Sequence, residues 1–258
     1  MLVLLLAGCE AKQERPRPSS DLELAEVGKL RVGVYPDDPL IEPGGQSGNS
    51  AGPLHDLSVE IGRELASRLR IAFEAVAFES QPPVLAAVSA GSVDVMIINA
   101  TPKRASVVDF SPDLLQTEQG FLVENGSPIA AIADVDRAHV RVGVSEGSTS
   151  QGLLAGLLKN ASIIPVATIK QAVEMLSHGE LDTFATNKAV LFALTDHLPG
   201  ARVLDGRYGL EHLALAVPKN RPKTLAYMSM FVKEATANGF VERAAAQVRV
   251  RGRPDTSK

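Results

Sequence analysis

Apolar residues recur along this chain with two different spacings, and the alternation between the two predicts its elements. Short runs that are apolar throughout, or at every second position, are typical of strands. They occur at residues 30–34, 71–78, 93–98, 120–123, 140–144, 181–185 and 213–217. Between them lie segments with helical spacing or with helix-start signals. They occur at residues 54–69, 82–91, 169–178, 187–194 and 222–241. This alternation predicts the α/β class with largely parallel sheets.

Two helix starts also carry a capping pattern. Ser148 is followed three residues later by Gln151, and Thr168 by Gln171. A hydroxyl followed at this spacing by a glutamine is the capping box, in which side chains satisfy the free N–H groups of the first turn. We therefore expect helices to begin just after Ser148 and Thr168.

An internal echo suggests that the chain contains two units of similar design. The sequence Arg-Val-Gly-Val at 31–34 recurs at 141–144. In each copy a Gly-x-x-Asp element follows, and an asparagine comes five residues after its aspartate. These elements are 91–94 with Asn99, and 179–182 with Asn187. Strand ends in open α/β sheets are where ligands sit, so the two asparagines are expected to face a shared cleft. The alternative is a chance similarity between buried strands.

These patterns predict a two-lobed layout in which the second lobe is inserted into the first. Two crossing segments then act as a hinge. The predicted parts are a signal segment at 1–9, a tether at 10–27, the first lobe at 28–124, the second lobe at 125–209, and a return segment with C-terminal helices at 210–258.

Composition narrows the functional class. The chain has 258 residues, 45% of them hydrophobic, and a formal net charge of −4. It has no run of basic residues with interleaved aromatics, so we expect no nucleic-acid partner. Its five histidines are scattered and it has a single cysteine, so neither a metal nor a cofactor is predicted.

The single cysteine lies at the end of a short apolar run. Residues 1–9 read Met-Leu-Val-Leu-Leu-Leu-Ala-Gly-Cys, which resembles the lipobox of bacterial lipoproteins. The resemblance implies cleavage before Cys9, acylation of its thiol, and a periplasmic or cell-surface protein anchored in the membrane. No basic residue precedes the apolar run, which leaves open a natural start upstream of Met1. The alternative is a hydrophobic N-terminus with a buried cysteine.

The order of the motifs resembles the bacterial extracellular solute-binding proteins of the amino-acid type. The motifs that carry this resemblance are 29–34, the helix from Leu54, 91–94, Thr101-Pro102-Lys103-Arg104 with 108–111, 142–149 and 179–182. It spans residues 28–245. It implies a type II periplasmic-binding-protein fold, with two mixed sheets flanked by helices and joined by two strands. It also implies a monomeric, non-enzymatic protein whose cleft closes on a small solute and hands it to an ABC permease.

Two sequence features favour an anionic solute. Arg104 follows a strand end, where a guanidinium can donate two hydrogen bonds to a carboxylate. In the resembling family this position grips the ligand carboxylate. Gly147-Ser148-Thr149 precedes a helix, whose free N–H groups and dipole favour an anion. The alternatives are a surface arginine and a capping loop without a ligand.

The chain also departs from the family pattern. Asn187 stands where amino-acid binders usually carry an acid for the ligand ammonium, and Asp38 and Gln81 stand where aromatic clamps are common. We therefore expect a polar pocket for a small anion, amino-acid-like or another carboxylate or oxyanion. Whether Asp38 pairs with an ammonium stays open. The predicted ligand contacts are Tyr35, Asp38, Asn99, Thr101, Arg104, Ser145, Ser148, Thr149 and Asn187.

An enzyme of the same fold is the alternative function. Cyclohexadienyl dehydratases use an acid in such a cleft to eliminate water and carbon dioxide, and fold alone does not separate binder from enzyme. The acids near predicted loops are Glu42, Glu79 and Glu146. The pair Glu211-His212 lies at the return crossing, where it could contact the ligand or the hinge.

Overall fold

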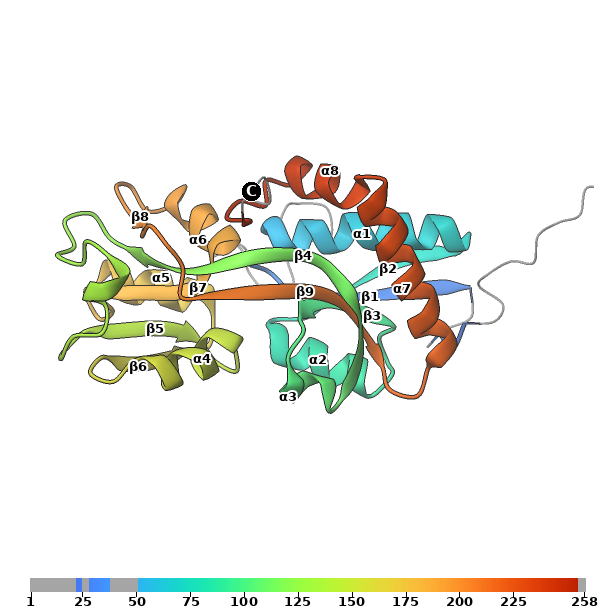
Figure 1. Ribbon diagram of the computed structural model, residues 1–258, viewed down its shortest axis with the longest axis horizontal. Coiled ribbons are helices and arrows are strands. Elements are labelled where there is room, and N and C mark those ends of the chain that lie inside the picture. The colour runs from blue at the N-terminus through green and yellow to red at the C-terminus, as the bar shows by residue number, and fades with distance from the viewer. Residues whose placement is uncertain (1–21, 25–27, 38–50, 255–258) are drawn as a thin grey trace, which may run out of the picture.

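The computed structural model describes residues 22–24, 28–37 and 51–254. The lipobox with Cys9, most of the tether, Asp38 and Glu42 lie outside the described residues. Within this part of the chain the strands form one hydrogen-bonded sheet in the order β2-β1-β3-β9-β4-β7-β5-β6, and β8 pairs with β4 (Figure 1).

The sheet has two halves, each covered by helices on both sides. The first half contains β1 (Lys29–Val34), α1 (Pro53–Leu69), β2 (Ala72–Ala77), α2 (Gln81–Ser89), β3 (Val95–Asn99) and α3 (Pro102–Ala105), with α7 (Pro222–Ala237) and α8 (Phe240–Gln247) packed on it. The second contains the 3₁₀ turn η2 (Ile132–Asp134), β5 (Arg141–Ser145), α4 (Thr149–Leu157), β6 (Ser162–Val166), α5 (Ile169–Ser177), β7 (Thr183–Asn187), α6 (Lys188–Thr195) and β8 (Arg202–Val203).

Two long antiparallel strands run through both halves. They are β4 (Val108–Val123) and β9 (Gly209–Pro218), paired from Val108 with Pro218 to Gln119 with Gly209. The strand pairing is parallel between β1 and its neighbours β2 and β3, and between β5 and its neighbours β6 and β7. The α/β class and the two-lobed, mixed-sheet architecture are thereby confirmed, with the two sheets continuous through β4 and β9.

Strand β4 is much longer than the sequence pattern predicts. The pattern indicates a strand only at 120–123, whereas β4 begins at Val108. Its first part carries polar residues such as Asp113 and Gln116, and its register shifts between Phe110 and Leu115. A strand that is half-exposed and irregular in register carries no clean alternation of apolar residues, so its start is hidden in the sequence.

The internal echo corresponds to a clasp that occurs in both halves. In the first, Arg31 N–H donates to Asp94 Oδ2 at 2.9 Å and Asp94 N–H donates to the Arg31 carbonyl at 3.0 Å. In the second, Arg141 N–H donates to Asp182 Oδ2 at 2.7 Å and Asp182 N–H donates to the Arg141 carbonyl at 2.9 Å. The repeated aspartate therefore joins the start of one strand to the turn that leads into the neighbouring strand.

The repeated glycine has a packing role. A β-carbon at Gly33 would lie 2.5 Å from Val84 Cγ1, and one at Gly143 would overlap Leu181. Side chains from helix α2 and from the turn before β7 pack directly on the backbone at these two positions. Only glycine fits such a close approach.

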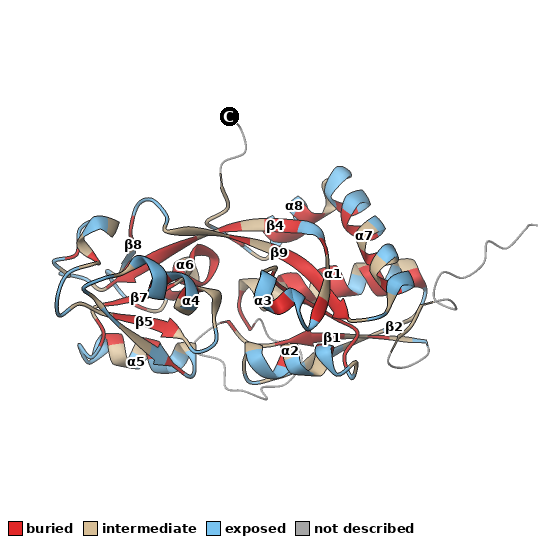
Figure 2. Ribbon diagram, turned by 60° about the horizontal axis from the view of Figure 1, so that its bottom comes forward, coloured by how far each residue is buried: buried red, intermediate tan, exposed pale blue. Residues whose placement is uncertain are grey.

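The cores lie between the sheet and its helices (Figure 2). Helix α1 buries Leu57, Ile61, Leu65 and Leu69 against the first half, as the helical spacing predicts. A second cluster in the same half lies under α2, and two further clusters fill the second half. Among the helices of the described residues, none is long and apolar enough to cross a membrane.

The predicted helix caps are present. Ser148 Oγ accepts from Gln151 N–H at 3.2 Å, and Thr168 Oγ1 accepts from Gln171 N–H at 3.1 Å. The side-chain oxygen of each glutamine in turn accepts a hydrogen bond from the residue before the cap. Gln151 Oε1 accepts from Gly147 N–H and Gln171 Oε1 from Ala167 N–H, both at 2.9 Å. The starts of α4 and α5 are therefore determined by local sequence.

Candidate functional site

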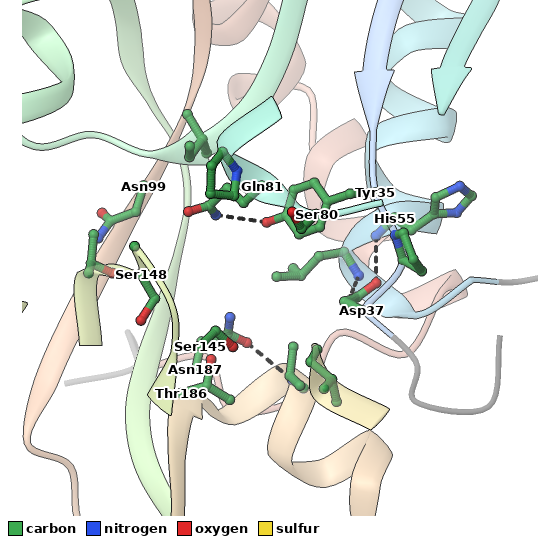
Figure 3. A pocket seen from close by; sticks show the side chains of 18 of the residues that line it. Tyr35, Asp37, His55, Ser80, Gln81, Asn99, Ser145, Ser148, Thr186 and Asn187 are labelled. Atoms are coloured by element: carbon green, nitrogen blue, oxygen red, sulfur yellow. Dashed lines mark hydrogen bonds between the residues drawn. The ribbon is translucent and has the colours of Figure 1, made fainter. Parts of the chain in front are cut away.

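A cavity of about 620 Å³ lies between the two halves of the molecule (Figure 3). The first half contributes the ends of β1 and β3 and the starts of α1 and α2. The second half contributes the ends of β5 and β7 and the starts of α4 and α6, and Glu211 and Leu213 come from β9. The carboxyl ends of parallel strands meet at one edge of each half, so the cavity forms where these two edges face each other. Its size is that of a small-molecule site.

Six of the nine predicted ligand contacts line this cavity. They are Tyr35, Asn99, Ser145, Ser148, Thr149 and Asn187. Thr101 and Arg104 are not among the described residues that line it, and Asp38 lies outside the described residues. The sequence thus located the edge of each half that faces the cavity.

Arg104 lies behind the cavity wall and its terminal nitrogens are engaged. The side chain is 7% exposed, Nη1 donates to the Asn99 carbonyl at 2.9 Å, and Nη2 donates to Gln81 Oε1. Gln81 Nε2 in turn donates to the hydroxyl of Tyr35 at 2.9 Å (Figure 3). Burial lowers the pKa of Arg104 from its ordinary value and raises the pKa of Tyr35 to about 12. The residue that lines the cavity at this position is therefore Gln81.

Thr101 has a local structural role. Its hydroxyl oxygen caps the short helix α3 by accepting from Arg104 N–H at 3.3 Å. This contact fixes the first turn of α3, in which Arg104 lies.

The loop before α4 was expected to offer free donors to an anion, and most of them are engaged within the protein. Gly147 N–H donates to Gln151 Oε1, and Ser148 N–H donates to the Ser145 carbonyl at 3.1 Å. The hydroxyl of Thr149 donates to Glu211 Oε1 at 2.7 Å. A carboxylate of the protein itself, that of Glu211, thus contacts the first residue of this helix.

Glu211 is the principal group of the cavity that was missing from the predicted contacts. It is 8% exposed, and its carboxylate accepts from Thr149, from Gln119 Nε2 at 3.2 Å and from the side chain of Asn187. Among the described residues, no lysine, arginine or histidine forms an ion pair with it. Burial raises the pKa of Glu211, while these hydrogen bonds and the charge of Arg104 oppose the rise.

Strand alternation separates Glu211 from its neighbour. Successive side chains of a strand point to opposite faces. Glu211 and Leu213 line the cavity, whereas His212 lies 2.5 Å from Asp113 Oδ2 through its Nδ1. The sequence indicated the pair Glu211-His212 at the crossing, and only the register of β9 assigns the glutamate to the cavity.

Asn187 is held by the helix that follows it. Its Oδ1 accepts from Val190 N–H at 3.1 Å and caps α6. The amide nitrogen is therefore the group left to face the cavity and Glu211.

Asp37 is a second buried acid that the sequence reading missed, one residue before the predicted Asp38. It is 2% exposed and accepts from Leu54 N–H at 2.9 Å and from His55 N–H at 3.0 Å. It closes the start of α1, whose N-cap Gly52 has no side chain to do so. Burial raises the pKa of Asp37 to about 7 in spite of these two backbone bonds.

The described lining carries more acids than bases. Asp37, Glu79, Glu146 and Glu211 are acidic, and Lys170 is the only lysine or arginine in this part of the lining. Glu79 and Glu146, which were considered as catalytic acids, are both exposed. No group of His, Cys, Asp and Glu within the described ranges could hold a metal ion.

Comparison with known proteins supports the architecture. The chain is 22% identical to the ABC transporter glutamine-binding protein GlnH of Bacillus subtilis over 92% of this chain and 89% of that protein. It is 24% identical to the glutamine-binding protein of Geobacillus stearothermophilus over 84% and 88%.

Solved structures share the fold. The amino acid substrate-binding protein AbpA of Streptococcus pneumoniae, bound to L-arginine, superposes with a TM-score of 0.73 at 20% identity, covering 87% of this chain and 97% of that one. The ancestral amino acid-binding protein AncCDT-1, a precursor of cyclohexadienyl dehydratase, superposes with a TM-score of 0.70 at 24% identity, covering 85% and 94%.

A family model covers most of the chain, including every element that lines the cavity. It matches residues 30–247. With the two-lobed fold and the cavity between its halves, this match shows that the chain belongs to the bacterial extracellular solute-binding proteins, family 3.

Proposed function

We propose that this protein is the solute-binding component of an ABC importer, which captures a small solute between its two halves and delivers it to a membrane permease. The observation that carries the proposal is the cavity of about 620 Å³ to which both halves contribute polar side chains, with β4 and β9 as the strands that run through both. Solute that contacts both halves favours the closed form, which a permease can recognise. Curated relatives named as glutamine-binding proteins, one of them from an ABC transporter, support it.

The solute that fits this site best is a neutral or cationic amino acid. The expectation of an anion is not supported, because Arg104 and the α4 loop already donate within the protein and the described lining is rich in acids. The relatives and neighbours point the same way, since they are named for glutamine or solved with L-arginine or lysine. Glu211 is the group suited to bind the solute ammonium. Position 187, where amino-acid binders usually carry an acid for this purpose, is an asparagine in this chain.

The proposed location is outside the cytoplasm, with a lipid anchor at Cys9. The family is extracellular, and the residues around Cys9 match a lipobox. Two acyl chains hold a protein stably at a membrane, and a tether keeps it near its permease. Substituting Cys9→Ala in the natural host should move the protein from the membrane fraction to the soluble fraction and abolish incorporation of labelled palmitate.

Calorimetric titration tests the proposed function. L-glutamine, L-arginine, L-lysine, L-glutamate and succinate are titrated separately into the purified protein. We expect one of the first three to bind with micromolar or tighter affinity, about −8 kcal/mol or better, and succinate not to bind. Absence of binding by every amino acid, or tightest binding by succinate, contradicts the proposal.

A second function is favoured by one observation. Glu211 is a buried acid in the cavity whose pKa is raised, which is the condition for a general acid. The structural neighbour AncCDT-1 is a precursor of cyclohexadienyl dehydratase. We favour binding, because the curated relatives are named as binding proteins. Release of carbon dioxide from a cyclohexadienyl carboxylate, lost in Glu211→Gln, would reverse this preference.

A further inference from the structure

We propose that Gln119 is the positioning residue of Glu211, and that its amide keeps this carboxylate charged and turned into the cavity for a solute ammonium. The inference rests on the proposed function and assigns a role in the same site to a residue behind the cavity wall. Gln119 belongs to β4 and is 1% exposed, and it is not among the described residues that line the cavity.

The side chain of Gln119 lies between Glu211 and the start of α4. Its Nε2 donates to Glu211 Oε1 at 3.2 Å and to Ser150 Oγ at 3.1 Å. Thr149 Oγ1 lies 3.4 Å from the same nitrogen. An ionised carboxylate only accepts hydrogen bonds, so the nitrogen end of the amide must face it. The amide therefore joins the acid of β9 to the first turn of α4.

Two further features hold Gln119 in this position. Ser150 Oγ also accepts from the Tyr208 hydroxyl at 2.8 Å, so the group that anchors the amide is itself anchored. Gln119 pairs with Gly209 in the sheet, and a β-carbon at Gly209 would lie 2.3 Å from Gln119 Oε1. The missing side chain of Gly209 thus leaves the space that the amide occupies. Glu211, two residues further along β9, points to the same face.

The side chains that bond to Glu211 differ in what they can do. The hydroxyl of Thr149 can donate to a carboxylate or accept from a neutral acid, so it satisfies either form. The amide nitrogens of Gln119 and Asn187 only donate, so they favour the charged form. Thr149 and Asn187 line the cavity, whereas Gln119 does not appear in its described lining. A change at Gln119 therefore alters Glu211 without removing a contact to the solute.

Glu211 has to stay ionised against the effect of burial. Burial raises the pKa of this carboxyl, while its hydrogen bonds and the guanidinium of Arg104 oppose the rise. Tyr35 and Tyr208 are further titratable groups that act on it, and burial raises the pKa of both, so their hydroxyls are neutral near pH 7. An amide donor stabilises the ionised carboxylate and adds no positive charge. Gln119 therefore supports the charge of Glu211 without cancelling it.

The variant Gln119→Met keeps the length of the side chain and removes the donor. The probe is whichever of L-glutamine, L-arginine and L-lysine binds the wild type most tightly. We expect its affinity to fall by about tenfold at pH 6. The loss should shrink as the pH rises to 8.5, because a carboxylate without its donor ionises only at higher pH. The ratio of wild type to variant cancels the titration of Asp37, the other buried acid of the lining.

A matched control lies on the same strand. Gln116 bonds to Asp113 and His212 instead of Glu211, so Gln116→Met should bind like the wild type at every pH. A purely structural role of Gln119 would lower the affinity by the same factor at each pH. An affinity ratio for Gln119→Met that is equal at pH 6 and pH 8.5 therefore overturns the inference.

A measurement without solute separates this inference from the proposed function. The protein is labelled with carboxyl-¹³C glutamate, and the Glu211 signal is identified by its loss in Glu211→Gln. The pH at which this signal titrates should be higher in Gln119→Met than in the wild type and unchanged in Gln116→Met. Gln119→Asn withdraws the amide by one methylene and should act in the same direction, and it decides the question if the methionine variant does not fold.

The two proposals then fail in different ways. A Glu211 titration that is not raised in the Gln119 variants overturns the role of Gln119, whatever the protein binds. If no amino acid binds the wild type, the proposed function fails, and the carbon titration still decides whether Gln119 keeps Glu211 charged.

Discussion

At the scale of single residues, the buried carboxylate of Glu211 determines the character of the cavity. Its bonds come from neutral groups on three other elements, which are Thr149 of α4, Gln119 of β4 and Asn187 of β7. A buried charge that forms no direct ion pair within the described part of the chain is costly, and neutral donors together with the more distant charge of Arg104 offset only part of that cost. The ammonium of a bound amino acid is a suitable counter-ion.

Replacing this carboxylate tests its role. Glu211→Gln keeps the size of the side chain and removes its charge, so we expect amino acids to bind more weakly by about 1.5–3 kcal/mol, the range of hydrogen bonds to charged groups. Calorimetric titration with the solute found for the wild type measures the change. Glu146→Gln, an exposed acid of the same cavity, is the control and should change the affinity much less. Equal losses of affinity in the two variants would show that binding depends only on the overall negative charge of the cavity and not on the position of Glu211.

At the scale of elements, the two strand clasps explain why the chain echoes itself. Asp94 is fully buried and lies 3.5 Å from Arg221 Nη1, whereas Asp182 is half-buried and pairs with the side chain of Arg141 at 2.9 Å. In both halves the carboxylate accepts the N–H at the start of the strand that carries the repeated sequence. Each clasp therefore holds the turn before β3 or β7 against the start of the neighbouring strand, β1 or β5.

The clasps predict unequal losses of stability. Asp94→Ala removes a fully buried carboxylate and leaves the partly buried Arg31 N–H without its acceptor, so the free energy of unfolding should fall by about 1–3 kcal/mol. Asp182→Ala should lower the free energy of unfolding by a smaller amount, because water reaches the second clasp. Urea unfolding measures both, and Asp205→Ala, at an exposed position, is the control. The assigned role is wrong if all three variants unfold at the same urea concentration.

Asp37 at the start of α1 predicts a pH dependence of stability. Its pKa is raised from 3.8 to about 7, so between these values the folded state holds a proton that the unfolded state has released. Unfolding then becomes easier as the pH rises from about 4 to 7, by up to about 4 kcal/mol, and the effect is constant above pH 7. His55 and Asp56 are the charged neighbours, and they act in opposite directions.

The comparison with Asp37→Asn isolates this effect. The free energy of unfolding is measured for both proteins from pH 4 to pH 8. We expect the wild type to lose stability relative to the variant as the pH rises to 7, and the difference to stay level beyond it. A difference that is independent of pH would mean that Asp37 is ionised throughout.

At the scale of the whole molecule, the two halves are joined mainly through β4 and β9. A salt bridge of 2.8 Å between Lys188 and Glu118 and a hydrogen bond of 2.8 Å from Glu118 N–H to the Gly252 carbonyl lie beside these strands. Leu54 of α1 packs against the cores of both halves. We expect the angle between the halves to change by bending of β4 and β9, because each half has a core of its own.

This arrangement predicts closure on the solute. The radius of gyration from small-angle X-ray scattering should fall when a bound amino acid saturates the protein, because solute that contacts both halves favours the closed form. At the same solute concentration the radius of gyration of Glu211→Gln should fall less, in proportion to the lower occupancy of its site. A radius that is unchanged at full occupancy would rule out closure as the basis of delivery.

Much of the fold follows from local sequence alone. The caps at Ser148 and Thr168, the repeated strand with its glycine and aspartate, and most of the strands and helices are confirmed, whereas the first part of β4 and the strands β6 and β8 were not predicted. Such features depend on residues a few positions apart, or on steric needs of the backbone itself, and these are visible in a single chain. They sufficed to place Asn99 and Asn187 at the edges that form the cavity.

The chemistry of the cavity was decided by tertiary structure. Gln81 meets Arg104 from a position 23 residues away, and Thr149 meets Glu211 from 62 residues away. Whether a guanidinium is free or covered, and whether an acid on a strand faces the cavity or its other side, depends on such distant partners and on strand register. Burial then sets the charge of each group, and burial is a property of the packed molecule, not of any segment.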